Sequence, residues 1–232
     1  MMNILAIMAH AEDAAYFCAG TLLKYKEQGH CVYIAVTTGT EAPWGAEEIS
    51  AQTRLLGFEA GTLRDDMVTR PAVLTAMRWA NADILLTHAP WDGDSDHAIT
   101  AKLVMDSLLI VGGKLHPASL PPINKLPHLF YTDTAAGTAL ENRYTLRNNR
   151  TTDQTFYLTP GVYSNNPFEP EAYVDVTAYM LAKEDMLRSN PVLAEGCHAQ
   201  CRIRGIQMGT RFAEGFTGHR MIGHIADYRL LP

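Results

Sequence analysis

Acidic and imidazole side chains gather at two places in this chain. The first is the stretch "HAED", in which His10, Glu12 and Asp13 directly follow the apolar run "NILAIMA". An imidazole and a carboxylate three residues apart on a turn can point at one ion, and zinc or a similar divalent cation accepts both. These residues alone favour a simpler interpretation, in which Glu12 and Asp13 complement the dipole of a helix that starts near Ala14.

The second place is the stretch "THAPWDGDSDHAIT", whose acidic and imidazole residues are His88, Asp92, Asp94, Asp96 and His97. Loops rich in aspartate and glycine also bind calcium, but the twelve-residue spacing of an EF-hand with its final glutamate is absent. The alternative is again structural, because Ser95 or Asp96 would cap a helix that begins at Ala98.

The elements around these clusters decide whether they can meet. Short apolar runs predict buried strands at 3–9, 31–37 and 82–90. Helical spacing predicts helices at 14–27, 47–56, 71–79 and 98–110. Strands that alternate with helices form an α/β fold, a mostly parallel sheet with helices on both faces. Ligands of such sheets bind beyond the carboxyl ends of the strands, where both clusters lie. His10, Asp13 and His97 would then form a three-ligand metal site with room for water, which is the catalytic zinc pattern.

The second half of the chain is less regular. Prolines precede a strand predicted in "HLFYTD", and residues 134–167 are polar with little apolar periodicity, which predicts an exposed insertion. Two more helices are predicted, at about 178–188 and 197–212. With no repeat and no clear boundary, the sequence predicts a single domain over 1–232.

Several of these stretches resemble the LmbE/PIG-L-like zinc-dependent de-N-acetylases. The family motif A-H-P-D-D corresponds to "AHAED", and H-P-D-H corresponds to "DSDH". The continuation "CAGTLLKYKEQGHCVYIAVTTG" and the later segments "FEPEAYVDVT" and "RGIQMGTRFAEGF" also agree, in the same order. The resemblance covers most of the chain outside 134–167. It implies a Rossmann-like fold and hydrolysis of an N-acetyl group, mostly on molecules that contain N-acetylglucosamine.

Carried over by position, the resemblance implies that His10, Asp13 and His97 bind the metal ion. Glu12 stands where the family has the aspartate that activates water, and Asp96 where an aspartate supports the active site. The implied cofactor is zinc or another divalent ion. It would polarise the acyl carbonyl and acidify a water molecule, while Glu12 acts as the general base.

The chain also departs from the family motifs. Ala11 replaces a proline, and Glu12 is one methylene longer than the usual aspartate. Asp94 stands where the family has a histidine that assists the tetrahedral intermediate or leaving group, and an ionised carboxylate there would repel a developing oxyanion. The substrate-binding arginine expected before "LLG" is not evident. A degenerate, non-catalytic member that binds metal or ligand is therefore the alternative. A nucleotide-binding domain is poorly supported, because the first strand–helix turn lacks the glycine fingerprint.

Other residues give weaker signals: Cys197 with His198 and Cys201, His219, His224, Glu214, Trp44 and Trp91. The two cysteines are four residues apart on a predicted helix and are expected to be ordinary buried thiols. The two histidines are expected to be structural, although one of them could replace the missing histidine. The tryptophans are expected to pack, with stacking on a sugar as the alternative. No role for Glu214 follows from the sequence.

The composition of the chain limits the classes of molecule that it can be expected to bind. The chain has a net charge of −6 and a pI of about 5.8, which argues against nucleic acid or an anionic membrane as partner. No apolar stretch approaches the length of a membrane span, and no signal peptide is recognised. Four cysteines do not make a disulfide framework in 232 residues. We expect a cytoplasmic protein that acts on a small N-acylated, sugar-like molecule, and a homo-oligomer is compatible with the sequence.

Overall fold

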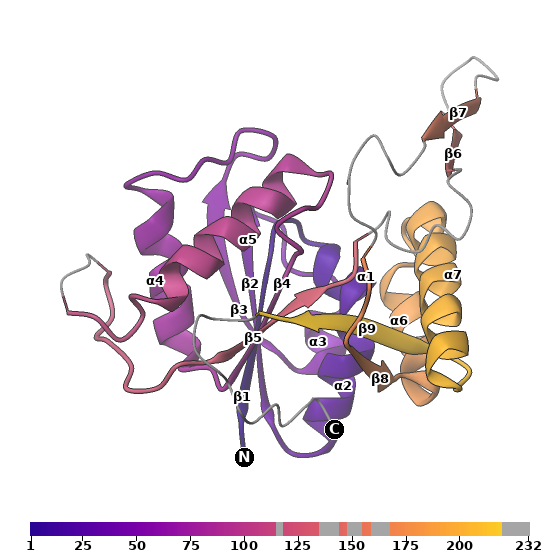
Figure 1. Cartoon of the computed structure of the whole chain (residues 1–232), viewed down its shortest axis with the longest axis horizontal. Helices are drawn as coiled ribbons and strands as arrows, with labels where there is room; N and C mark the ends of the chain where they lie inside the picture. Colours follow the sequence, from indigo (N-terminus) through magenta and orange to yellow (C-terminus); the bar gives the residue numbers. More distant parts are fainter. Residues whose placement is uncertain (115–117, 135–143, 148–154, 159–167, 220–232) are drawn as a thin grey trace.

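A mixed sheet forms the centre of the fold (Figure 1). The computed structural model describes residues 1–114, 118–134, 144–147, 155–158 and 168–219. Within them, seven strands pair in the order β3-β2-β1-β4-β5-β9-β8. Their bounds are β1 Asn3–Met8, β2 Cys31–Thr38, β3 Gln52–Phe58, β4 Ile84–Thr87, β5 His128–Thr132, β8 Ala172–Asp175 and β9 Ala213–Gly218. The first five strands in this order are parallel, while β9 and β8 pair antiparallel. The predicted α/β fold with a mostly parallel sheet is confirmed.

Helices cover both faces of the sheet. One face carries α1 Asp13–Phe17, α2 Ala19–Glu27, α3 Ala46–Ile49, α6 Met180–Met186 and α7 Pro191–Met208. The other face carries α4 Thr69–Ala80 and α5 Ser95–Leu108. Figure 1 shows α4 on the left, α5 crossing in front of the parallel strands, and α6 and α7 on the right. A short 3-10 helix, Thr177–Tyr179, precedes α6. No helix in the described part of the chain is both long and apolar enough to span a bilayer.

Strand β1 shows why the apolar runs fold into a buried sheet. It pairs with β2 on one side and β4 on the other, so every residue lies in the interior of the sheet. Ile4 and Met8 pack toward α1 and α2, whereas Leu5 and Ile7 pack toward α4 and α5, and all four are fully buried. Burial on both faces explains the continuous apolar pattern, since no side of the strand meets water.

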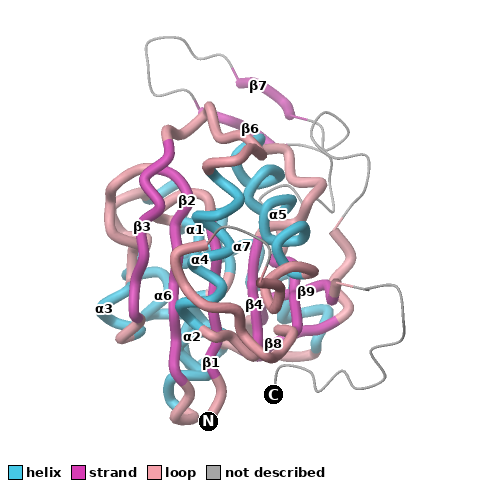
Figure 2. Tube along the Cα trace, turned by 90° about the vertical axis from the view of Figure 1, so that its left-hand side faces the viewer, coloured by secondary structure: helices cyan, strands magenta, loops and turns pink. Residues whose placement is uncertain are grey.

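The helix predicted over 47–56 is wrong. Helix α3 is only four residues long and ends at Ser50, whose φ of 53° is left-handed. The next residues form the edge strand β3, in which half-buried and exposed side chains alternate from Arg54 onward. Because an edge strand buries only one face, its apolar residues are few, and Leu55 remains 40% exposed. Figure 2 shows β3 beside β2 at the margin of the sheet.

Other boundaries also differ from the prediction. The helix predicted over 14–27 is two helices, because the backbone leaves helical geometry at Cys18 (φ −144°, ψ 9°). Helix α5 begins three residues before Ala98. The last helix lies over 191–208 rather than 197–212, and strand β9, which was not predicted, follows it. Of the predicted insertion at 134–167, the structure describes only Thr134 and the antiparallel pair β6 Tyr144–Arg147 and β7 Thr155–Leu158; the rest lies outside the described residues.

Candidate metal centre

The two clusters of acids and histidines meet at the carboxyl edge of the sheet. Strand β1 ends at Met8 and leads directly into His10 and the start of α1. Its parallel neighbour β4 ends at Thr87, and the loop after it leads to α5, which carries His97 in its first turn. Because parallel neighbours end at the same edge, these segments are brought together across nearly ninety residues of sequence.

Three side-chain atoms form a compact triangle there. His10 Nδ1 lies 3.2 Å from His97 Nε2, and each of these nitrogens lies 3.4 Å from Asp13 Oδ2. Zinc bonds of about 2.0–2.1 Å in a tetrahedron separate neighbouring ligand atoms by roughly 3.4 Å. The three predicted ligands therefore fit a divalent ion without rearrangement, and they leave the remaining tetrahedral position to another molecule.

A carboxylate lies behind each of the two histidines. His10 Nε2 is 3.3 Å from Asp96 Oδ2, which also accepts the N–H of Gly61 at 2.6 Å. His97 Nδ1 is 3.2 Å from Asp92 Oδ2, in a contact that is not aligned as a hydrogen bond. Such carboxylates orient the ring of a metal-binding histidine and make it a better ligand. Asp96 lies where the resemblance implied a supporting acid, whereas no role was predicted for Asp92.

The electrostatics of the triangle favour a cation. Burial would raise the pKa of Asp13, but the surrounding His88, His10 and His97 hold it well below its usual range. The hydrogen bond to Asp13 raises the pKa of His10 to about 9. Burial opposes a charge on His97, yet its contacts with Asp13 and Asp92 raise its pKa to about 10. The carboxylates thus draw positive charge to this point, and protons and a divalent ion would compete for it.

His88 lies beside the triangle, and no role was predicted for it from the sequence. It is fully buried, and its ring stacks on His97 with the centroids 3.8 Å apart and the planes 7° apart. Its Nε2 lies 3.1 Å from Asp13 Oδ2, so Asp13, His88 and His97 make a second possible ligand set. However, the same Nε2 accepts the N–H of Ala9 at 2.9 Å, which occupies its lone pair. We therefore assign His88 to the wall of the site.

Glu12 and Asp94 lie beside the triangle. Glu12 is half-buried at the start of α1, with a carboxylate oxygen within 4.8 Å of donor atoms of His10 and Asp13. Asp94 is exposed, and a carboxylate oxygen lies within 4.8 Å of donor atoms of His10 and His97. Asp94 Oδ1 also accepts the N–H groups of Asp96, at 2.8 Å, and of His97, at 3.3 Å. The cap of α5 is therefore Asp94, and not Ser95 or Asp96 as the structural alternative expected.

The residues with weaker signals lie elsewhere. Cys197 and Cys201 are buried free thiols, and neither belongs to a candidate metal group among the described residues. His219 Nδ1 pairs with Tyr131 Oη at 2.6 Å. The backbone N–H of Trp44 donates to the carbonyl of Ala11 in the first motif, and its indole N–H donates to Glu41. Trp91 packs on Tyr131, and His224 lies outside the described residues.

Glu214 has a structural role that the sequence did not reveal. Its carboxylate accepts the N–H groups of Gly20 and Thr21 at 3.0 and 2.8 Å and the hydroxyl of Thr21 at 2.6 Å. It thereby caps α2 just after the break at Cys18, and it pairs with the fully buried Lys183. A Cβ at position 20 would meet Val176 at 2.5 Å, so this close approach requires glycine.

Comparison with known proteins identifies the fold. No family model matches the chain. The structure of GalB, the 4-carboxy-2-hydroxymuconate hydratase from Pseudomonas putida KT2440, is similar with a TM-score of 0.73 at 15% identity, over 97% of this chain and 100% of that one. The N,N'-diacetylchitobiose deacetylase from Pyrococcus horikoshii is similar with a TM-score of 0.68 at 16% identity, over 93% and 83%. The chain has the LmbE/PIG-L-like fold.

A third structure with this LmbE/PIG-L-like fold is the conserved protein TT1542 from Thermus thermophilus. Its TM-score is 0.73 at 20% identity, over 99% of this chain and 100% of that one. The expected fold is therefore confirmed over nearly the full length. The hydratase and the deacetylase show that proteins of this fold catalyse more than one reaction.

Proposed function

We propose that this protein is a metal-dependent hydrolase that removes an acyl group, in the first place acetyl, from an N-acylated amino sugar or a related small molecule. The observation that carries the proposal is the triangle of His10 Nδ1, Asp13 Oδ2 and His97 Nε2, with 3.2–3.4 Å between its atoms. The presence of a deacetylase among the structures with this fold supports the choice of reaction.

In this proposal, His10, Asp13 and His97 hold zinc or another divalent ion. When bound, the ion supplies Lewis acidity, which polarises the acyl carbonyl and acidifies water. Glu12 is the general base, because its carboxylate lies beside the triangle and is free of a capping hydrogen bond to α1. It accepts a proton from the attacking water and returns it to the nitrogen of the leaving amine.

The surrounding acids have different tasks. Asp96 and Asp92 fix the rings of His10 and His97, so that one nitrogen of each ring faces the ion. Asp94 is held by the first turn of α5, and its negative charge disfavours a developing oxyanion nearby. We therefore expect a substrate whose carbonyl oxygen is directed away from Asp94.

A second candidate is water addition to a carbon–carbon double bond. Two observations favour it: the hydratase of the same fold, and an aspartate where a deacetylase motif has histidine. A metal centre with one carboxylate base can activate water for either reaction. The two reactions differ in their products. Hydrolysis of an amide releases a free amine and a carboxylate, whereas hydration adds water to a double bond and releases no second molecule.

The proposal is tested with purified protein loaded with zinc. The substrates are a panel of N-acetylated amino sugars, and release of acetate is measured. We expect about one zinc ion per chain and turnover that Glu12→Gln abolishes without loss of metal. His10→Ala should lose both metal and turnover. Bound zinc without turnover of any N-acyl amide would favour the non-catalytic or hydratase alternatives, and unchanged metal content in His10→Ala would refute the site itself.

A further inference from the structure

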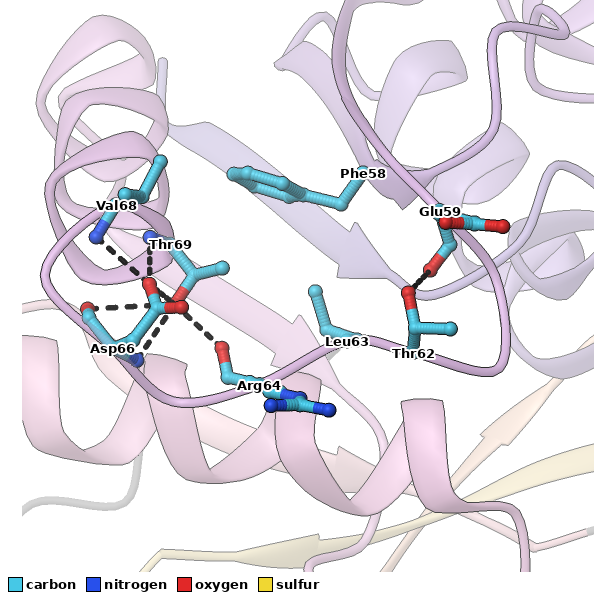
Figure 3. Close-up of a pocket in the computed structure, with 8 residues that line it drawn as sticks. All are labelled: Phe58, Glu59, Thr62, Leu63, Arg64, Asp66, Val68 and Thr69. Atoms are coloured by element: carbon cyan, nitrogen blue, oxygen red, sulfur yellow. Dashed lines mark hydrogen bonds between the residues drawn. The ribbon is translucent and has the colours of Figure 1, made fainter.

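A hollow of about 260 Å³ lies after the end of β3, where the chain turns toward α4 (Figure 3). Its walls include the ring of Phe58 and the side chains of Leu63, Val68 and Thr69. In Figure 3, the Phe58 ring, Leu63 and Val68 surround a common space, whereas the guanidinium group of Arg64 lies on the far side of Leu63. The space is large enough for a six-membered ring or a short aliphatic chain.

Several polar groups that line the hollow bind one another, and Figure 3 shows the charged ends of Glu59 and Arg64 lying away from the ring of Phe58. Asp66 Oδ1 accepts the N–H groups of Val68 and Thr69 at 2.8 and 3.0 Å. The hydroxyl of Thr69 donates to the carbonyl of Arg64 at 2.6 Å, and the hydroxyl of Thr62 donates to the carbonyl of Glu59 at 3.1 Å. A ligand in this space therefore meets mainly carbon, which favours an apolar group over a sugar ring rich in hydroxyls.

The hollow and the metal centre share one edge of the sheet. Phe58 of β3 pairs with Thr38 of β2, and Thr38 donates its N–H and its hydroxyl to the carbonyl of Ala9, the residue before His10. Two strand spacings of about 4.8 Å place Phe58 roughly 10 Å from this end of β1. This separation is within the length of one molecule of moderate size.

The turn between the two places contacts both of them. Glu59 and Thr62 line the hollow, and between them Gly61 donates its N–H to Asp96, the carboxylate behind His10. Gly61 has a φ of +78°, which a residue with a side chain rarely adopts. This turn thus belongs to the wall of the hollow and to the support of the metal centre.

The mouth of the hollow is also apolar. Val68, one of its walls, is 68% exposed. Burial of such a side chain under a ligand is favourable, because it removes apolar surface from water. From these observations we infer that the hollow binds the apolar, non-reacting part of the substrate, such as a single aromatic ring or a short alkyl group. The inference rests on the proposed function, whose substrate class it narrows to N-acyl compounds with an apolar arm.

The first test measures binding without catalysis. Benzyl alcohol is the probe and glycerol the polar control, each followed by ligand-observed NMR on zinc-loaded protein. Val68→Trp fills the mouth, whereas Met67→Trp is the matched control, since Met67 does not line the hollow. We expect wild type and Met67→Trp to bind benzyl alcohol and Val68→Trp to bind at least tenfold more weakly, with no binding of glycerol.

A second variant, Val68→Lys, places a charge at the mouth and should weaken binding in the same direction without relying on a bulky side chain. Equal binding of benzyl alcohol by wild type and both Val68 variants would overturn the inference. Self-association of the wild type that Val68→Trp abolishes would also overturn it, because the hollow would then hold a second copy of the chain.

The second test connects the hollow to catalysis. N-acetylglucosamine and its benzyl glycoside have the same scissile amide and differ in the apolar arm. We expect wild type and Met67→Trp to show at least tenfold higher kcat/KM for the benzyl glycoside, and Val68→Trp to lose this difference. Equal kcat/KM for the two compounds in the wild type would contradict the inference. Binding of benzyl alcohol with no hydrolysis of either compound would instead refute the proposed function. Failure of the proposed function is thus distinguished from failure of the inference about the hollow.

Discussion

Two buried polar clusters in this molecule contain similar residue types and differ in how their groups are satisfied. Around Glu214, both carboxylate oxygens have hydrogen-bond donors, and Lys183 balances the charge. Around Asp13, carboxylates and imidazole nitrogens converge on one point, and Asp96 Oδ1 is buried without a hydrogen-bond partner. A closed network of this kind stabilises a fold, whereas a convergent and incompletely satisfied one is typical of a ligand-binding site.

The difference shows why residue type alone is a poor guide to function. Glu214 belongs to the "AEGF" segment that resembles the deacetylase family, yet its contacts with α2 and Lys183 are those of a structural residue. No role was predicted for Asp92, yet its Oδ2 lies 3.2 Å from Nδ1 of the predicted ligand His97. The geometry of the polar groups, more than their residue types, separates the two clusters.

The largest effect is expected for Glu12→Gln. Loss of a general base typically reduces turnover about 10²–10⁴-fold. Because Glu12 is not one of the three proposed ligands, its variant should keep the zinc content of the wild type. Turnover and bound zinc are measured on the same sample, with Glu41→Gln as a surface control. Turnover unchanged by Glu12→Gln would remove Glu12 from the mechanism.

Substitutions in the cluster around Glu214 should change the stability of the protein rather than its zinc affinity. Glu214→Gln leaves the charge of Lys183 buried without its partner, which costs about 3–5 kcal/mol of unfolding free energy. Replacing both residues, as in Glu214→Gln with Lys183→Met, should recover part of this loss. Urea unfolding measures the effect, and zinc affinity of the folded variant should stay near that of the wild type. A large loss of zinc affinity without loss of stability would mean that the two clusters are not distinct in role.

The metal centre should also depend strongly on pH. In the metal-free protein, the pKa values of His10 and His97 are raised from 6.5 to about 9 and about 10, which favours protonated rings at pH 7. Zinc needs neutral imidazoles, so its affinity should rise up to about 100-fold per pH unit, with up to two protons released per ion. Calorimetry in buffers of different ionisation enthalpy counts these protons. Zinc binding without proton release would contradict the assignment of both histidines.

The same pKa shifts predict the opposite trend for metal-free stability. Groups whose pKa is raised on folding contribute stability that is fully present below pH 6.5 and is lost as pH rises through about 9 to 10. The metal-free protein should therefore become less stable over this window, and the zinc-bound protein should not follow it. Thermal unfolding with and without a chelator measures the contrast.

Smaller effects are expected for the carboxylates behind the histidines. Asp96→Asn and Asp92→Asn should each weaken zinc binding about 10–100-fold, because the rings lose the partners that orient them. Asp94→Asn should weaken zinc binding less than these two variants, because Asp94 does not support a histidine ring and asparagine keeps the helix cap. Competition with a chromogenic chelator gives all three affinities. Equal affinities for the three variants would remove the distinction between supporting and capping acids.

The sequence predicted the parts of the site that follow from strand order. The meeting of His10, Asp13 and His97 could be predicted, because each motif follows the end of an apolar strand and neighbouring parallel strands end at one edge. The contacts of His88 could not be predicted from the sequence, because its stacking on His97 depends on the rotamers of two buried rings. The pair of Lys183 and Glu214 likewise joins α6 to β9, and no local pattern marks it.

The fold was predictable where apolar patterns were strong. Strand β1 was recognised because its apolar run is continuous, and helix α4 because its apolar residues recur at helical spacing. Strand β3 was mistaken for a helix, since an edge strand with one buried face has only Leu56 and Phe58 as its half-buried apolar residues. The break at Cys18 was missed because the backbone there is set by the carboxylate of Glu214, from the other end of the chain.

The central claim is that His10, Asp13 and His97 together hold one divalent ion. The most direct measurement is the zinc stoichiometry and affinity of wild type, Asp13→Asn and Glu12→Gln, determined side by side on folded protein. We predict one tightly bound zinc ion in wild type and in Glu12→Gln, and loss of that ion in Asp13→Asn. A wild-type protein that binds no zinc or other divalent ion, or an Asp13→Asn variant that binds it as tightly as wild type, would contradict the account.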